Sequence, residues 1–405
     1  MNKDSIQTTH IPRDAALRPS WVMVLCCLIV FMMQMATTVY LPSLPVVMRE
    51  LAMSQSLVEM SISGFVVGAA LPVLFWGSAA DRWGRRGPLL VSLALFVLCS
   101  ALLAAAGSAV ELLVLRALQG SAAGGAAIIA RIIVRDNWSG DELARRLSVL
   151  SIAFITALSA GQFIGGLIGE YSHWQVGFVL MAVTGTLAAL LSMTVPLQGG
   201  QPAASRQSGS PYWQILRRLG FTLPACAGGL GFATTITLQE ASPFVFQEHF
   251  GLAVSSFGNV GLLIGLAYFC GAWTVNRTVA KLGGKKLMRA GALLMAAATV
   301  ATLLCWHLGA LEAKPGLLLF VCLYCLTIFG QAVLFPNSMA AAVSDAKNHG
   351  AHAMALCGFL QQGLAGIAAT VSVLLHHNGA WTLAMAVLGL TTLLLVLFQA
   401  HLRVP

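Results

Sequence analysis

Charged residues are scarce in this 405-residue sequence. Lys, Arg, Asp and Glu make up only 9% of it, whereas 58% is hydrophobic. Soluble domains carry about 25% charged residues, so this composition excludes a soluble enzyme and a disordered chain. A Gly-rich phosphate-binding loop ending in Lys is also absent, as is any Ser/His/Asp or metal-ligand constellation. We therefore expect neither ATP-driven nor catalytic chemistry, and no bound cofactor or metal.

Cysteines are few and fall where disulfides are not expected. All nine lie inside long apolar runs, which favours a role as small packing residues and excludes a secreted disulfide scaffold. Cys322-x-x-Cys325 has redox spacing but lies in mid-helix. His376 and His377 are adjacent, so a helix cannot direct both at one metal ion.

Twelve uncharged apolar runs are long enough to cross a bilayer as helices. Backbone groups in lipid must be paired within their own segment, which leaves helices as the only interpretation. The sequence thus predicts an all-α membrane protein with twelve transmembrane helices in two six-helix repeats. The expected spans are 21–41, 57–77, 88–107, 110–131, 147–169, 175–195, 219–240, 256–275, 287–308, 316–337, 351–375 and 381–402.

A Gly/Ser/Pro/Gln-rich stretch without apolar periodicity separates the sixth and seventh runs. The predicted domains are an N-terminal six-helix bundle over 1–195, a cytoplasmic linker over 196–218 and a C-terminal six-helix bundle over 219–405. An even six-plus-six division is typical of transporters built from two repeated halves.

The net charge of +9 is distributed unevenly. With twelve spans both termini share one side, and 20 of the 23 Lys and Arg residues fall on that side against two opposite. By the positive-inside rule the termini are cytoplasmic. The basic excess is therefore a topology signal and does not indicate nucleic acid. The run from Trp21 is too long for a signal-peptide core, so we expect the first helix to be retained in a bacterial inner membrane.

The loop between the second and third runs has a fixed spacing of glycines, one acid and three guanidiniums. Small residues allow two helices to approach and the chain to turn, and a carboxylate beside guanidiniums can lock one gate through an interhelical charge network. The predicted gating residues are Gly77, Asp81, Arg82, Gly84, Arg85 and Arg86.

This loop resembles the signature of the major facilitator superfamily. A second copy over 276–285 begins 199 residues later, with Ala280 in place of the acid. Further stretches resemble the Bcr/CflA branch of twelve-span drug–proton antiporters, namely 40–45, 131–136, 242–251 and 350–361. The resemblance implies export of small, mostly amphipathic compounds driven by entering protons, with no other energy source.

Arg116 lies well inside the fourth span, where a charge costs several kcal/mol unless it is paired or hydrated. Gln119 follows one turn later on the same face. The stretch also resembles the family's span-four motif, whose arginine is linked to proton coupling. In the fifth span Gln162 stands where the family's antiporter motif has proline, which suggests either pocket lining or an interhelical hydrogen bond.

The family's first-span Asp is absent, because Thr38 occupies that position in Thr-Val-Tyr-Leu-Pro. A threonine cannot carry a proton in the useful pH range. Two carboxylates within spans, Glu59 and Glu240, are the remaining candidates for coupling, beside Arg116. Either carboxylate could instead be an interfacial residue wetted by headgroups. The candidate substrate-cavity residues are Gln34, Thr38, Tyr40, Gln119, Gln162, Gln331 and Gln361.

These observations predict a secondary active exporter that binds a small molecule and protons, works by alternating access and functions as a monomer. One alternative is a dedicated exporter of a metabolite such as a siderophore, another metallophore or an amino-acid derivative. A cation-coupled importer is disfavoured by the antiporter-like fifth span. A membrane sensor would require a signalling domain that we do not expect here.

Overall fold

A computed structural model describes residues 13–138, 140–195, 197, 212–312, 314–345, 350–374 and 380–401. Its first half contains α1 (Arg13–Thr38), η1 (Leu41–Ser43), α2 (Leu44–Glu50), α3 (Gln55–Ala70), α4 (Val73–Trp83), α5 (Arg86–Leu103), α6 (Ala109–Asn137), α7 (Gly140–Tyr171) and α8 (Gln175–Thr194). Its second half contains α9 (Tyr212–Leu216), α10 (Leu219–Phe244), η2 (Val245–His249), α11 (Val254–Leu282), α12 (Gly284–His307), α13 (Lys314–Asp345), α14 (Gly350–Leu374) and α15 (Ala380–His401).

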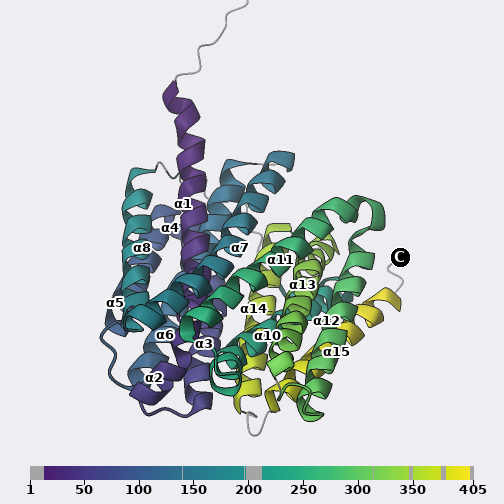
Figure 1. The fold of residues 1–405 in the computed structure, drawn as a ribbon. Helices are drawn as coiled ribbons and strands as arrows, with labels where there is room; N and C mark the ends of the chain where they lie inside the picture. Colours follow the sequence, from purple (N-terminus) through teal and green to yellow (C-terminus); the bar gives the residue numbers. More distant parts are fainter. Residues whose placement is uncertain are drawn as a thin grey trace, which may run out of the picture.

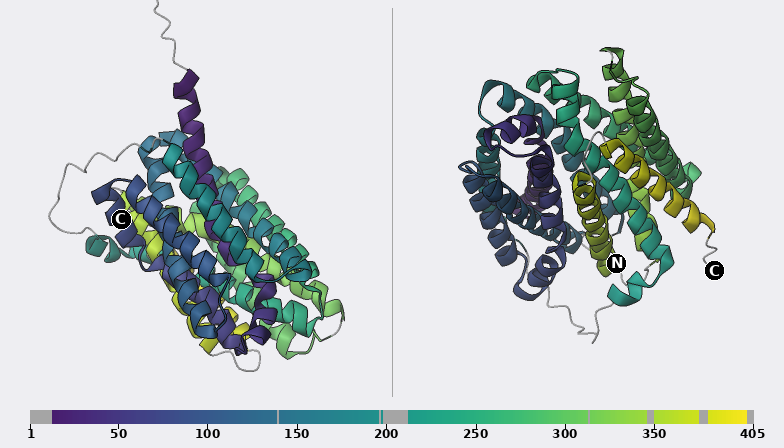
Figure 2. Two further views of the ribbon diagram at one scale, coloured as in Figure 1. Left: turned by 90° about the vertical axis from the view of Figure 1, so that its left-hand side faces the viewer. Right: turned by 90° about the horizontal axis from the view of Figure 1, so that it is seen from below.

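The described residues contain 12 helical stretches long and apolar enough to cross a membrane, which confirms the predicted number. Helices of the first half gather on one side of the molecule and those of the second half on the other (Figure 2). Most of the predicted linker lies outside the described residues, as do His376 and His377. The domain boundaries stay a prediction.

The helices of the first two spans are interrupted near prolines: the break in the second falls inside the predicted span 57–77, and the break in the first falls where the predicted span 21–41 ends. The first span continues from α1 through η1 and α2, where Pro42 and Pro45 occupy the opening positions of the two short helices. The second span is interrupted at Leu71 and Pro72, between α3 and α4. Proline has no N–H to donate and its ring clashes with the preceding turn, so the helix restarts at each of these places.

Close helix contacts depend on positions without a side chain. A Cβ atom added to Gly124 of α6 would collide with the backbone carbonyl of Ala69 in α3. A Cβ atom on Gly166 of α7 would lie 2.6 Å from the Cα atom of Gly258 in α11. The second contact joins the two halves, because α7 and α11 belong to different repeats (Figure 1). Small residues allow such backbone approach in membrane helices.

The two repeats share one backbone feature at the positions that the sequence offset predicts. Gly84 follows α4 with φ 81°, and Gly283 follows α11 with φ 78°. Glycine adopts this left-handed region without a steric penalty. We refer to the end of the bundle that carries these two turns as the basic-loop end, and to the end that carries α2 and η2 as the opposite end.

Polar contacts join the two halves towards the opposite end. Gln247 Nε2 donates to Pro42 O at 2.8 Å, and Ser255 N donates to Glu170 Oε2 at 3.2 Å. Arg49 and Glu248 form an exposed ion pair of 3.5 Å. In Figure 1 the ribbons of the two halves lie together at this end and diverge towards the basic-loop end. The structure is therefore joined at the opposite end.

We expect Gly124→Ala to lower the stability of the detergent-solubilised protein by about 1–3 kcal/mol, because the new methyl group overpacks the α3–α6 contact. Gly64→Ala is the matched control, since a Cβ atom at Gly64 would meet nothing within 4 Å. Thermal denaturation should show a lower melting temperature for Gly124→Ala alone. Equal melting temperatures for the two variants would contradict the close contact.

Candidate functional site

Arg85 is the centre of the charge network at the basic-loop end. Its Nη1 atom donates to Asp81 Oδ1 at 2.7 Å and to Ala80 O at 2.6 Å, while Nε donates to Asp136 Oδ2 at 2.8 Å. The side chain is 7% exposed. Burial by itself would lower the pKa of Arg85, but the hydrogen bonds and negative charges of Asp136 and Asp81 outweigh it and raise that pKa. Arg85 thus ties the α4–α5 turn to the end of α6.

The other predicted gating residues contribute unequally. Arg86 is exposed and its Nη2 atom donates to Val195 O, after α8, at 2.7 Å. Arg82 is exposed and lies 5.9 Å from the centroid of the Trp83 ring. A Cβ atom at Gly77 would meet nothing within 4 Å, so close helix approach does not explain that glycine. The network as a whole lies within the first half.

Arg116 is fully buried and is held by neutral groups. Its Nη1 atom donates to Ala36 O at 3.1 Å and to Gln119 Oε1 at 2.7 Å. Gln119 in turn donates to Ser100 Oγ at 2.8 Å. Among the described residues no carboxylate lies within ion-pair distance of Arg116, and its Nε and Nη2 atoms have no hydrogen-bond partner.

Three aromatic rings surround the Arg116 guanidinium. Its central carbon lies 4.5 Å from the ring centroid of Phe65, 5.3 Å from that of Tyr40 and 5.9 Å from that of Phe178. Ring faces attract cations, and the attraction is strongest where water is excluded. These aromatic partners come from the first, second and sixth spans. Arg116 therefore holds the core of the first half together while remaining without a counter-ion.

Thr38 packs between two helices. Its hydroxyl donates to Ala157 O of α7 at 3.2 Å, and its side chain fills the space above Gly161, where an added Cβ would collide with it. Thr38 is completely buried. The structure thus places this substitute for the family's Asp in the α1–α7 contact.

Glu59 and Glu240 are buried side chains from different halves. Glu59 of α3 is 0% exposed and Glu240 of α10 is 1% exposed. Gln55 Nε2 donates to Glu59 Oε1 at 2.8 Å. The charge of Glu59 acts electrostatically on the Glu240 carboxyl, and Ser63 faces the same carboxyl. The two candidate coupling acids therefore interact with each other. Neither forms an ion pair with Arg116.

Among the predicted cavity amides, one forms a hydrogen bond between the halves and others keep an amide oxygen without a partner. Gln162 Nε2 donates to Phe257 O of α11 at 3.1 Å, so this side chain forms an interhelical hydrogen bond between the halves. Gln361 Nε2 donates to Ser338 Oγ at 3.2 Å, and the Oε1 atoms of Gln331 and Gln361 have no partner. Gln34 is only partly buried. Unsatisfied buried oxygens are candidate contacts for a donor group of a ligand.

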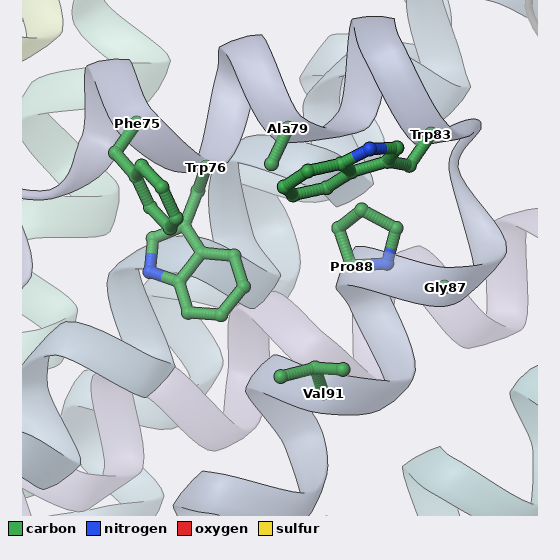
Figure 3. A pocket seen from close by; sticks show the side chains of 7 residues that line it. All are labelled: Phe75, Trp76, Ala79, Trp83, Gly87, Pro88 and Val91. Atoms are coloured by element: carbon green, nitrogen blue, oxygen red, sulfur yellow. The ribbon is translucent and has the colours of Figure 1, made fainter.

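A pocket of 270 Å³ lies outside this set, between α4 and α5. Figure 3 shows that its walls are rings and small apolar groups. Phe75, Trp83 and Val91 are more than half exposed, as expected for a surface that contacts lipid chains. The lining residues are Phe75, Trp76, Ala79, Trp83, Gly87, Pro88 and Val91.

Residues 26–370 match the family model described as Major Facilitator Superfamily. The chain belongs to the major facilitator superfamily. It is accordingly a multi-pass membrane transporter and not an enzyme, as the loop signature and the internal repeat suggested.

Individual superfamily members support the resemblance to the Bcr/CflA branch. The chain is 25% identical to multidrug resistance protein D of Escherichia coli, over 93% of this chain and 94% of that protein. It is 28% identical to the MFS-type transporter YdgK of Bacillus subtilis, over 87% and 88%. It is 24% identical to the bicyclomycin resistance protein homolog of Haemophilus influenzae, over 62% and 64%.

Solved structures of superfamily members share the fold. A D-xylose–proton symporter superimposes with a TM-score of 0.75 over 96% of this chain and 98% of its own, at 17% identity. A POT family transporter in complex with 5-aminolevulinic acid gives a TM-score of 0.77 over 93% and 94%, at 13% identity.

Several partners in these sites were not singled out from the sequence. Gln55 and Ser63 lie four residues before and four residues after Glu59, on the same face of α3. This spacing is a sequence signal that could have indicated them. Phe65 and Phe178 carry no such signal, because an aromatic residue in a span is ordinarily a packing residue. Asp136 had appeared only within the family-like stretch at the end of the fourth span.

Arg85→Ala should destabilise the protein by about 3 kcal/mol, because it leaves Asp136 partly buried without its cation. Arg82→Ala is the control from the same loop and should change stability by about 0.5 kcal/mol or less, as expected for an exposed side chain. Thermal denaturation in detergent compares the two. Similar destabilisation by both variants would show that loop charge in general, and not the Arg85 network, matters.

Proposed function

We propose that this transporter exports small amphipathic compounds from the cytoplasm in exchange for entering protons. The observation that carries the proposal is the presence of two carboxyl groups buried within the spans, neither of which is paired with Arg116, because neutral groups hold that guanidinium. A buried carboxyl group that exchanges its proton with water only when the protein opens can couple proton movement to alternating access.

The names of the relatives support the substrate class. Multidrug resistance protein D and the bicyclomycin resistance protein homolog are similar to this chain over most of their lengths. Amphipathic compounds suit a binding region with few fixed charges, in which amides such as Gln331 and Gln361 can orient a ligand. We infer that Arg116 keeps the first half rigid while substrate binds between the halves.

We further propose a bacterial inner-membrane location, a monomeric transporter and cytoplasmic termini. Support for this orientation comes from the 20 Lys and Arg residues on the terminal side of the twelve spans. In this orientation the basic-loop end faces the cytoplasm and the opposite end faces outwards, so the structure is joined on its outer side.

Reporter fusions to the C-terminus test the orientation. A green fluorescent protein should fluoresce there, because it folds in the cytoplasm, whereas alkaline phosphatase should be inactive. Fusion of the same reporters after Ser108, in the loop before α6, should give the reverse pattern. Active phosphatase at the C-terminus would invert the topology and place the joined end inside.

Transport is tested in everted membrane vesicles that contain a fluorescent pH probe. Addition of a substrate should release protons from the lumen of wild-type vesicles. Glu240→Gln and Arg116→Ala should each abolish this release at normal expression, because one removes a proton carrier and the other the central cation of the first half. Glu111→Gln, an exposed carboxylate at the opposite end, should transport normally.

The choice of compounds distinguishes the two substrate classes. A panel of unrelated amphipathic drugs should give proton release with several members. Release with only a chelator or an amino-acid derivative would favour a dedicated metabolite exporter. If no compound moves protons at any pH, proton antiport is wrong.

A further inference from the structure

Glu59 and Glu240 are buried carboxyl groups from different halves, on helices α3 and α10, which pack against each other. Glu59 belongs to the second span and Glu240 to the seventh. Both are essentially inaccessible, and the charge of one acts directly on the other. Two ionised carboxylates at close range inside a protein repel each other strongly, because little water screens them.

Glu240 has no cation to offset this repulsion. No Lys, Arg or His of the described residues lies within 4.0 Å of its carboxyl oxygens, and neither oxygen has a hydrogen-bond partner that satisfies normal geometry. Ser63 faces the carboxyl, but its hydroxyl is directed to Met60 O at 3.4 Å. A buried carboxyl in this position is accommodated most easily when it is neutral.

A line of polar side chains leads to the pair from the opposite end. Gln55 is the first residue of α3, and Glu59 and Ser63 follow at intervals of four, which places all three on one face of the helix. Each step advances about 6 Å along the helix axis. Gln55 is partly exposed and donates to Glu59. Gln55 therefore lies between solvent at the opposite end and Glu59, and water that enters when this end opens meets Glu59 first.

Most other charged groups on the elements packed against the pair have contacts elsewhere. Residues 353–373 of α14 and 381–399 of α15 contain no Lys, Arg, Asp, Glu or His. On α6, Arg131, Arg135 and Asp136 lie in the last turns of the helix, towards the basic-loop end. The residues with an ion pair, a hydrogen bond or an aromatic contact elsewhere are Tyr40, Arg49, Glu50, Glu111, Arg116, Arg135, Asp136, Glu248, His249, Tyr324 and Asp345.

We propose that Glu59 and Glu240 act as one proton-coupling site, in which a retained proton lets the two halves close at the opposite end and its loss drives them apart there. This inference rests on the proposed function and deepens it, because it assigns the coupling to an interface between the halves. The site replaces the first-span carboxyl that Thr38 lacks.

The direction of the resulting cycle agrees with antiport. When the pair loses its proton towards the basic-loop end, repulsion between the two carboxylates opens the opposite end and exposes bound substrate there. Water in the opened end then delivers a proton to one of the two carboxylates, which removes the repulsion and allows the halves to close again. Substrate thus leaves through the end from which the proton arrives, and one proton is consumed in each closing step.

The experiment measures the separation of the halves as a function of pH, without substrate. Spin labels are attached at Tyr171→Cys and Leu308→Cys, two exposed positions at the opposite end, in a full-length protein without native cysteines reconstituted into lipid. The label–label distance should be short at low pH and lengthen as pH rises between about 5 and 9. In Glu59→Gln and Glu240→Gln the distance should stay short throughout.

Comparison of single and double variants identifies a pair. Because repulsion needs two charges, each single Gln variant should lose the pH response as completely as the double variant. A partial response in each single variant would indicate independent acids and overturn the proposal. Glu240→Asp should keep a response, and Glu111→Gln should behave as wild type; loss in Glu111→Gln would attribute the effect to general surface titration.

The outcomes also separate this inference from the proposed function. A pH-independent distance in the wild-type protein overturns the coupling site even where efflux is observed. A pH-dependent distance that needs both carboxyls supports the site even where the vesicle assay detects no drug transport, and only the export proposal then fails.

Discussion

Every polar group within a bilayer must find its partner inside the protein, because lipid chains offer none. This constraint explains why the described spans are helical apart from the short breaks near Pro42 and Pro72, and why most charges lie at helix ends. It also makes the exceptions informative. Arg116 meets the constraint in part, through a carbonyl, an amide and three rings, while its Nε and Nη2 atoms have no hydrogen-bond partner. In the coupling site that we propose, the packing of the halves depends on whether one of the two buried carboxyls is neutral.

The spans could be predicted from local hydropathy, the repeat from the spacing of two similar loops, and the buried charges from their positions inside apolar runs. Which side chains meet could not, since those contacts depend on how helices far apart in sequence are packed. Glu59 and Glu240 were recognised as separate candidates, but their proximity emerges only when α3 lies against α10. The sequence allows Gln162 either to line the pocket or to form an interhelical hydrogen bond. In the structure its side chain donates a hydrogen bond to Phe257 O. The break at Leu71 and Pro72, inside the predicted second span, could not be predicted because hydropathy continues across it.

Thr38 shows how a missing acid alters the helix interface as well as the chemistry. Its methyl and hydroxyl groups fit the space left by Gly161, and its proton is donated to a backbone carbonyl of α7. A carboxylate in the same place would present two acceptors to that carbonyl and would require a new donor or a wider gap. The α1–α7 contact is thus compatible with the neutral residue, and the proton coupling that we propose is assigned to other residues.

The paired turns at Gly84 and Gly283 have nearly the same backbone angle in different electrostatic surroundings. In the first repeat the next residue, Arg85, donates hydrogen bonds to Asp81 and Asp136, whereas in the second repeat the corresponding residue is Gly284, which has no side chain. The turn geometry therefore does not depend on that charge network, because the same backbone conformation forms at Gly283 without a guanidinium in the next position.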